Sequence, residues 1–276
     1  MNIQKHGGKI AANSLVWGYA LIILVPIIWV VSNSFKRQID ILTGKTFAPF
    51  TWSNYESLLF SRQSDFLGNL LNSVIISSIA TTAVIMIATM AAYTLVRLNP
   101  PKWVKWMLLG WALFFHMLPT LTFVGSWFIM FSSVGLHGTY FAMISTLIVM
   151  NLPVALFLMV TFTEAVPVEI IQAARMDGCN SRQTFFQVVF PLVRGGMIAA
   201  AALVFIFAWS DFSVAVVLTS KDTMTVPVAI ATFAQEFEIK YGEMAAGSVL
   251  SMIPAITLIL FGQKFVVRGL LAGAVK

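Results

Sequence analysis

The chain has 276 residues, of which 59% are hydrophobic and only 10% are charged, and its mean hydropathy is +0.88. Soluble domains contain about 45–50% apolar and about 25% charged residues, so this composition excludes a soluble globular protein and indicates an integral membrane protein. The net charge of +6 is scattered among apolar segments and does not indicate nucleic-acid binding. The single cysteine, Cys179, excludes an internal disulfide and a cysteine-rich metal site.

The N-terminal part of the chain predicts a first membrane span. Residues 1–14 carry Lys5 and Lys9 and are predicted to form a cytoplasmic N-terminus. The apolar run 15–34 has the length that a spanning helix needs, and it lacks a convincing small-residue cleavage site, so we interpret it as an uncleaved span. Residues 35–66 are rich in charges and are predicted to form an outer loop.

A second span is predicted over residues 67–96, and it carries a polar stripe. Small hydroxyl and amide residues recur there at three- and four-residue spacing, at Asn69, Asn72, Ser73, Ser77 and Thr81. Such residues either cement contacts between helices or line a pathway, and both interpretations stay open. Basic residues then mark a cytoplasmic turn, at Arg97, Lys102 and Lys105.

The third span is predicted over residues 104–131, with a kink near Pro119. Proline removes a backbone hydrogen bond and bends a helix, and the nearby His116 either bonds a freed carbonyl group or takes part in a translocation path. A fourth span is predicted over residues 139–162.

The next segment, 163–193, is predicted to be a cytoplasmic loop that contains a helix, a turn and a second helix. Pro167 suits the start of a helix, Glu169 suits its positive end, and Gly178 is a natural left-handed stop. Ser181 is predicted to cap the second helix. The helical repeat places Val168, Ile171 and Ala174 on one face. Because neighbouring antiparallel helices need only short connections, we expect something outside the membrane to bind this loop.

A fifth span is predicted over residues 194–218, and it carries a carboxylate. A charged group inside a span is costly, so Asp211 is a functional candidate, with Trp209 and Ser210 beside it. The alternative is an acid near the outer interface, hydrated or paired. The remaining predicted segments are an outer loop, a sixth span and a cytoplasmic tail, at residues 219–245, 246–267 and 268–276.

This division predicts an all-α polytopic membrane protein with six transmembrane helices and both termini in the cytoplasm. It places eleven of the 17 basic residues on the cytoplasmic side and six outside, as the positive-inside rule requires. The sequence contains no complete phosphate-binding loop and no paired nucleophile and base, and its three histidines are dispersed. The chain is therefore predicted not to be an enzyme and to bind no cofactor or metal itself.

The cytoplasmic loop resembles a known family motif. It reads Gln172-Ala173-Ala174, three residues, Gly178, nine residues, Val188, one residue and Phe190-Pro191. This is similar to the E-A-A-x3-G-x9-I-x-L-P loop of permease subunits of bacterial ABC importers. Further segments resemble the carbohydrate-uptake branch of this family. Within that branch they are similar to the maltose-importer permease subunit that carries a C-terminal tail. These segments are residues 33–36, 69–73, 91–93, 209–211 and 267–276.

The resemblance implies a type I importer permease fold in the bacterial cytoplasmic (inner) membrane, with residues 67–267 as one permease domain. It implies a second homologous permease, an ATPase dimer that binds ATP and Mg²⁺, and an extracytoplasmic solute-binding protein. The implied ATPase-docking set is Glu169, Gln172, Ala173, Ala174, Asp177 and Gly178, and the implied tail toward the ATPase is Gly273, Ala274, Val275 and Lys276. The family's usual acid is replaced by Gln172, and Glu169, one turn earlier, could supply the charge.

The function predicted from this resemblance is ATP-driven import of a sugar or sugar derivative by alternating access. The candidate translocation path comprises Asn72, Ser73, His116, Trp209, Ser210 and Asp211. One alternative keeps the machinery but carries a polyol or a glycerol-phosphate-like solute. Another is a self-sufficient secondary transporter with Asp211 as its ion site.

Overall fold

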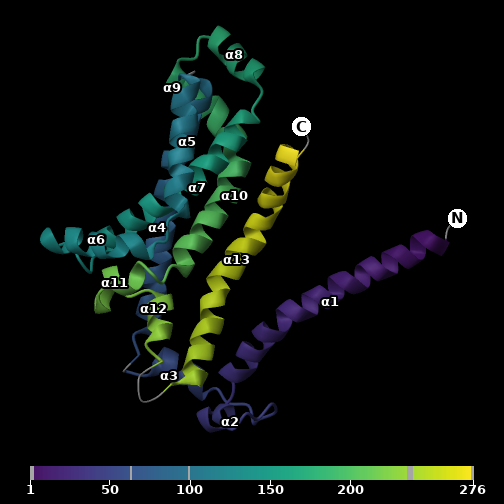
Figure 1. The fold of residues 1–276 in the computed structure, drawn as a ribbon, viewed down its shortest axis with the longest axis vertical. Coiled ribbons are helices and arrows are strands. Elements are labelled where there is room, and N and C mark those ends of the chain that lie inside the picture. The colour runs from purple at the N-terminus through teal and green to yellow at the C-terminus, as the bar shows by residue number, and fades with distance from the viewer. Residues whose placement is uncertain (1–2, 63, 99, 235–238, 275–276) are drawn as a thin grey trace. The chain divides into compact units, whose positions relative to one another are not determined.

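The computed structural model describes residues 3–62, 64–98, 100–234 and 239–274, and all the regular elements in these ranges are helices (Figure 1). The elements are α1 (Ile3–Ser34), α2 (Gln38–Leu42), α3 (Ser53–Phe60), α4 (Phe66–Arg97), α5 (Lys102–Met117), α6 (Leu121–Ser133), α7 (Tyr140–Glu164), α8 (Val168–Met176), α9 (Ser181–Gln183), the π-helix η1 (Thr184–Val189), α10 (Phe190–Ser210), α11 (Ala215–Leu218), the 3-10 helix η2 (Lys221–Thr223), α12 (Val226–Ala231) and α13 (Tyr241–Ala274). By length and composition, the described residues contain five candidate membrane spans, or six if the bent pair α5–α6 is one span.

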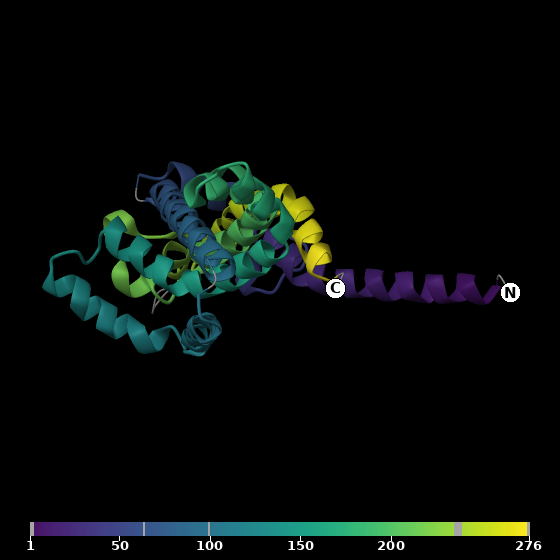
Figure 2. The same cartoon turned by 90° about the horizontal axis from the view of Figure 1, so that it is seen from above.

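The break between α5 and α6 is the largest departure from a straight span. The axes of the two helices differ by 95°, and Figure 2 shows α5 nearly end-on while α6 lies lengthwise. Leu118 adopts an extended backbone (φ −75°, ψ 137°) because the ring of Pro119 disfavours the helical conformation of the preceding residue. The bend is much larger than the kink that the sequence predicts for residues 104–131.

The predicted loops contain helical structure of their own. The outer loop 35–66 includes α2 and α3, and the outer loop 219–245 includes η2 and α12. Helix α10 begins at Phe190, four residues before the predicted fifth span 194–218. It ends at Ser210, and Asp211 has an extended backbone.

The contacts within the chain divide it into two compact units, residues 1–67 with 229–252, and residues 68–228 with 253–276. In the second unit α7 packs against both α5 and α10, and the three helices run side by side in Figure 1. Small residues permit this packing: a Cβ added at Gly196 of α10 would lie 2.3 Å from the ring of Phe162 on α7. The α8 segment lies at one end of these helices and α6 at the other (Figure 1).

The first unit is built around Asn54, a buried residue of α3. Its Nδ2 donates hydrogen bonds to the carbonyl groups of Ser34 and Lys36, both at 2.9 Å, and so satisfies acceptors at the C-terminal end of α1. The hydroxyl groups of Ser34 and Tyr55 are 2.8 Å apart in a buried hydrogen bond. One amide therefore joins the end of α1 to α3.

The hydrogen bonds of Asn54 predict that a larger residue at Gly242, in the first turn of α13, destabilises the protein. A Cβ at Gly242 would lie 2.5 Å from Asn54 Oδ1, and the Asn54 amide cannot move without losing its two hydrogen bonds. We expect Gly242→Ala to destabilise the protein by about 1–3 kcal/mol, as overpacking typically does. The measurement is the unfolding temperature of the purified protein in detergent. Gly125→Ala is the matched control, because among the described residues no atom beyond its own turn of helix lies within 4 Å of its added Cβ. Equal unfolding temperatures for the two variants would contradict the prediction.

Candidate functional site

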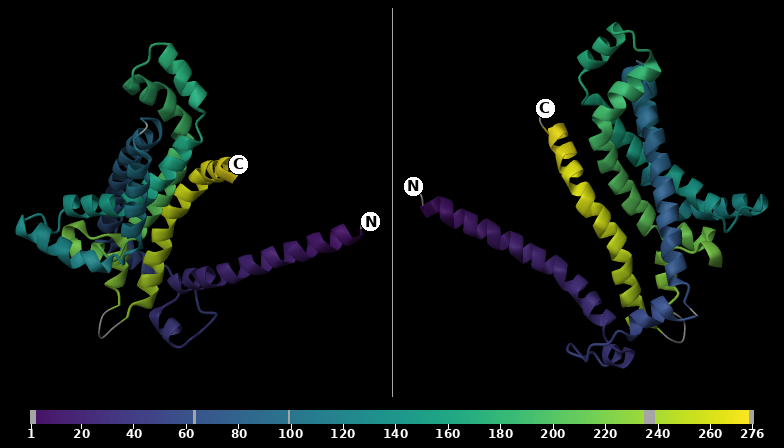
Figure 3. Two further views of the ribbon diagram at one scale, coloured as in Figure 1. Left: turned by 45° about the horizontal axis from the view of Figure 1, so that its top comes forward. Right: turned by 180° about the vertical axis from the view of Figure 1, so that it is seen from behind.

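The candidate site is the segment α8–α9 of the predicted cytoplasmic loop, which Figure 3 shows from two sides at one end of the α7–α10 pair. Pro167 precedes α8 with a φ of −57°, and Glu169 lies in the first turn, where a carboxylate favours the positive end of the helix. Ile171 and Ala174 are buried, whereas Val168 is 46% exposed. The predicted apolar face therefore holds at two of its three positions, and the helix packs on the chain through those two residues.

The opposite face of α8 is uncovered in this chain. Glu169, Gln172, Ala173 and Asp177 are exposed, and Met176 is 83% exposed. Within the predicted docking set, Ala174 differs from the others because it lies on the packed face, 8% exposed. A surface formed by α8 thus presents a carboxamide and two carboxylates around small and apolar groups.

Gly178 ends α8 in a left-handed conformation, with a φ of +88°. The N–H of Cys179 donates to the carbonyl group of Ala174 at 3.0 Å, and the N–H of Gly178 donates to that of Arg175 at 3.1 Å. These two bonds form a Schellman motif, in which glycine is favoured because it has no Cβ to clash. The glycine stop predicted from the sequence is confirmed at this position.

The cap of the second helix is Asn180, so the prediction of Ser181 was wrong. Asn180 Oδ1 accepts a hydrogen bond from the N–H of Gln183, and Gln183 Oε1 accepts one from the N–H of Asn180, each at 2.9 Å. This reciprocal capping box needs an amide or acid three residues after the cap, which Asn180 has and Ser181 does not.

A π-helix follows α9 and leads into α10. It covers residues 184–189, and Pro191 comes at the start of α10. Proline has no N–H to donate and its ring crowds the carbonyl group four residues earlier, so a widened turn is a physically reasonable way to continue the helix past it. The motif positions Val188, Phe190 and Pro191 therefore lie at the junction between the loop and the span.

The C-terminal end of α4 holds both sides of the segment. Arg97 Nη2 donates to the carbonyl group of Thr163 at 2.7 Å and to that of Val166, which lies between α7 and α8. On the other side, the Tyr93 hydroxyl donates to the carbonyl group of Ser181 at 3.4 Å, and its ring lies 5.2 Å from that of Phe185. We call Arg97 and Tyr93 the α4 clasp.

A second basic residue supports the same end. Lys105 on α5 forms an ion pair with Glu164, the last residue of α7. Helix α4, helix α5 and the segment before α8 are thus joined by a few polar contacts, whereas the outer face of α8 is left uncovered.

The candidate path residues have several local roles. Asn72 Nδ2 donates to the carbonyl groups of Asp222 and Met224, at 2.9 and 3.0 Å, and Ser73 Oγ accepts from the N–H of Val226 at 2.8 Å. Both are buried, so they hold residues 222–226 of the predicted outer loop against α4. These contacts favour the cementing interpretation of the polar stripe at these two positions.

The other candidates lie at helix ends. His116 is exposed in the last turn of α5. Trp209 is buried and stacks on Phe205, and Ser210 Oγ donates to the carbonyl group of Ile206. Asp211 Oδ1 accepts hydrogen bonds from the N–H groups of Val214 and Ala215, at 3.0 and 3.3 Å. Asp211 therefore binds two backbone N–H groups at the start of the short helix α11.

Comparison with known proteins identifies the family. The family described as "Binding-protein-dependent transport system inner membrane component" matches residues 84–271. The chain belongs to this permease family. The trehalose transport system permease protein SugB of Mycobacterium tuberculosis is 37% identical, over 96% of this chain and 95% of SugB. The trehalose/maltose transport system permease protein MalG of Thermococcus litoralis is 33% identical, over 93% of both chains.

Solved structures bear out the fold of the permease. A chain of a bacterial ABC transporter involved in the import of the acidic polysaccharide alginate superposes with a TM-score of 0.78. The match covers 96% of this chain and 98% of that one, at 20% sequence identity. The expected all-α importer-permease fold, the resemblance to the carbohydrate-uptake branch and the multi-pass location in the bacterial inner membrane are thereby confirmed.

The sequence did not indicate the contacts of the α4 clasp. Arg97 was assigned only to a basic cytoplasmic turn, because its carbonyl partners lie 66 and 69 residues away. In the predicted tail, Gly273 and Ala274 lie at the end of α13, and Val275 and Lys276 lie outside the described residues. Its role stays a prediction.

Proposed function

We propose that this permease is one of two homologous membrane subunits of an ATP-driven importer for a sugar or sugar derivative. An extracytoplasmic binding protein delivers the solute, and a dimer of ATPase subunits binds ATP and Mg²⁺, while this chain binds no cofactor. Support comes from relatives named for trehalose, trehalose/maltose and diacetylchitobiose transport. A relative named for sulfoquinovosyl glycerol, 30% identical, extends the substrate class to modified sugars.

The observation that carries the proposal is an exposed helix on a fixed base. Helix α8 presents Glu169, Gln172, Ala173, Asp177 and Gly178 outward. Its inner face and its two flanks are held by Ile171, Ala174 and the α4 clasp. Such a segment fits into a cleft of the ATPase, and closure of the ATPase dimer then moves α4 and α7 through the clasp.

At the usual acid position this chain offers a carboxamide. The Gln172 side chain can donate a hydrogen bond to a charged partner or accept one from it. Such a hydrogen bond is weaker than a bidentate ion pair between a carboxylate and an arginine. Glu169 is also exposed and lies one turn earlier, so we assign it the negative charge of the docking surface.

Uptake into proteoliposomes tests the proposal. The complete importer is reconstituted with ATP on the ATPase side and the binding protein on the other, and labelled trehalose, maltose, diacetylchitobiose and glycerol 3-phosphate are supplied in turn. We expect accumulation of a sugar only when both ATP and the binding protein are present. Accumulation of glycerol 3-phosphate and of none of the sugars would favour the alternative of a polyol or glycerol-phosphate-like solute.

The control is the permease reconstituted alone. A self-sufficient secondary transporter would take up solute without ATP or partner subunits, driven by an ion gradient. We expect no uptake by the isolated chain under a proton or sodium gradient. Uptake under that condition would overturn the proposal, and Asp211→Asn would then test whether that carboxylate binds the ion.

A further inference from the structure

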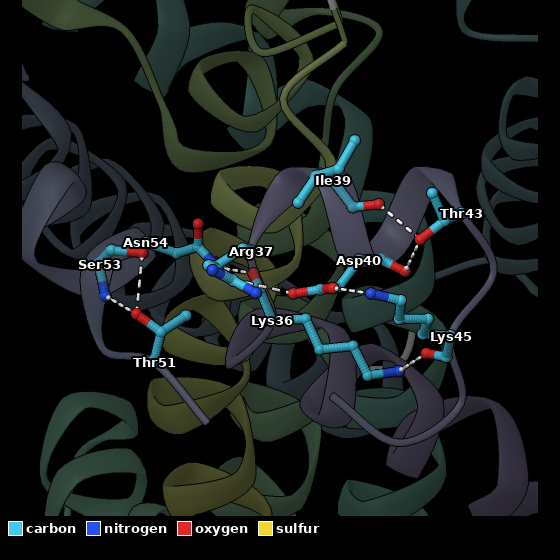
Figure 4. Close-up of polar contacts among 9 residues, drawn as sticks. All are labelled: Lys36, Arg37, Ile39, Asp40, Thr43, Lys45, Thr51, Ser53 and Asn54. Atoms are coloured by element: carbon cyan, nitrogen blue, oxygen red, sulfur yellow. Dashed lines mark hydrogen bonds and ion pairs between the residues drawn. The ribbon is translucent and has the colours of Figure 1, made fainter. Parts of the chain in front are cut away.

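A basic cluster lies directly after the predicted outer end of α1. Asp40 on α2 has no exposed surface, and its carboxylate accepts hydrogen bonds from Arg37 Nε at 3.0 Å and Lys45 Nζ at 2.9 Å (Figure 4). The Lys45 hydrogen bond lowers the pKa of Asp40, burial opposes this shift, and Arg37 adds to it. The carboxylate therefore stays ionised and is compensated by two cations.

Lys36 is a third cation in this cluster, and it has no anionic partner. Its side chain is only 4% exposed. Its Nζ donates to Asn33 Oδ1 and to the carbonyl group of Lys45, both at 3.1 Å, and lies 4.9 Å from the centre of the Trp29 ring. All three neighbours are neutral, and among the described residues no carboxylate lies within ion-pair distance of Lys36. A buried ammonium group without a counter-charge is costly, so an anion bound beside it would stabilise the site.

A cavity is lined in part by Lys36. It has a volume of about 180 Å³ and is lined by Ser32, Phe35, Lys36, Thr46, Phe47, Ala48 and Phe50. We call it the Lys36 cavity. Phe47 at its rim is 95% exposed and Phe50 is 62% exposed, which is unusual for aromatic side chains facing water. The cavity thus combines one buried positive charge with an apolar, aromatic rim.

The position of the cavity selects the ligand. The candidate span in α1 runs from Asn13 to Ser34, and the cavity lies at its end, with Trp29 half exposed one turn before. Tryptophan side chains mark the level of the lipid headgroups, and long apolar side chains of α1 below that level are exposed along the span. A ligand at this level has its charged group beside Lys36 and its apolar part along α1.

We propose that the Lys36 cavity binds the phosphate group of an anionic phospholipid of the outer leaflet. Lys36 supplies the uncompensated charge, and Arg37 and Lys45, whose side chains are more than half exposed, raise the local positive potential. The acyl chains lie along the apolar surface of α1, and Phe47 and Phe50 lie at the headgroup level. The bound lipid would hold the outer end of the first span at a fixed depth, independently of the solute that is carried.

Native mass spectrometry of the purified importer complex tests this site. The probes are phosphatidylglycerol, phosphatidylcholine and inorganic phosphate, each titrated into delipidated complex. We expect phosphatidylglycerol to bind about tenfold more tightly than phosphatidylcholine, and Lys36→Gln to weaken its binding about tenfold. Arg62→Gln is the matched control, because Arg62 is an exposed cation of the same loop outside the cluster; it should leave binding unchanged.

A second variant keeps the test decisive if Lys36→Gln does not fold. Ala48→Phe places a ring into the cavity and alters no charge, and it should weaken phosphatidylglycerol binding as much as Lys36→Gln does. Equal lipid binding by Ala48→Phe and the unchanged protein would overturn the proposal. Displacement of phosphatidylglycerol by millimolar inorganic phosphate would overturn the lipid assignment and leave a site for a free anion. Equal affinity for the two lipids would exclude charge recognition.

Discussion

Replacing Gly178 by valine is expected to remove nearly all ATP-driven uptake while the permease still inserts and assembles. Gly178 has a φ of +88°, a conformation that L-residues rarely adopt and β-branched residues avoid most strongly. The variant must give up the hydrogen bonds from Gly178 and Cys179 that close α8, so the direction of the chain after α8 changes. The measurement is uptake into proteoliposomes at equal amounts of assembled complex.

Two further variants separate backbone strain from crowding. Among the described residues, leaving aside Gly178 and its two chain neighbours, no atom lies within 4 Å of a Cβ added at Gly178, so backbone strain is the cost expected inside the permease. We expect activity in the order glycine, asparagine, alanine, valine, because asparagine tolerates the left-handed region better than alanine does. The alanine variant should lose about 5–30-fold, which corresponds to about 1–2 kcal/mol of strain. If the asparagine variant is less active than the alanine variant, the loss of activity depends on the size of the side chain against a docked partner, and the strain explanation is wrong.

The local structure of the loop could be predicted from the sequence because it depends on the backbone chemistry of single residues. Pro167 before α8, Glu169 in its first turn and Gly178 after it act within a few residues of their own positions. The wrong prediction of Ser181 as the cap of the second helix also arose from the chemistry of neighbouring residues. Asn180 and Ser181 are both capping residues, and only the glutamine three residues after Asn180 distinguishes them.

The polar residues of the spans were harder to interpret, because their roles depend on distant partners. Asn72 is assigned by its contacts with Asp222 and Met224, about 150 residues away, and neither contact leaves a local pattern in the sequence. Asp211 was a functional candidate because a carboxylate inside a span is costly. In the structure, α10 has already ended there, and two backbone N–H groups bind the carboxylate.

Replacing Arg97 by alanine is expected to uncouple ATP hydrolysis from uptake. The change removes the donor to two carbonyl groups, of the buried Thr163 and Val166, and such unpaired buried groups cost about 1–3 kcal/mol each. An energy of that size corresponds to about a 5–150-fold change in the population of a positioned segment. We expect uptake per ATP hydrolysed to fall by a factor in this range. Both rates are measured on the same proteoliposomes.

Two matched variants distinguish positioning from charge. Arg97→Lys keeps the positive charge, but the ammonium nitrogen of lysine lies one bond closer to the backbone than Nη2 of arginine, so it cannot occupy the position from which Nη2 reaches both carbonyl groups, and we expect the variant to be only partly active. Lys102→Ala removes an exposed positive charge from the same turn, which is predicted to be cytoplasmic, and should leave the coupling ratio unchanged. Equal losses in Arg97→Ala and Lys102→Ala would indicate that only the charge of the turn matters.

The α4 clasp also predicts how much each flank of α8 contributes to coupling between ATP hydrolysis and uptake. Arg97 holds the segment before α8, and Tyr93 holds Ser181 after it through a long hydrogen bond of 3.4 Å and a ring contact with Phe185. Because a bond of that length is weak, Tyr93→Phe should retain most of the coupling, since the ring contact remains. Tyr93→Ala should behave like Arg97→Ala, because the flank after α8 then loses the ring contact that joins it to α4. If Tyr93→Ala couples normally, motion of α8 reaches the spans through the flank before α8 alone.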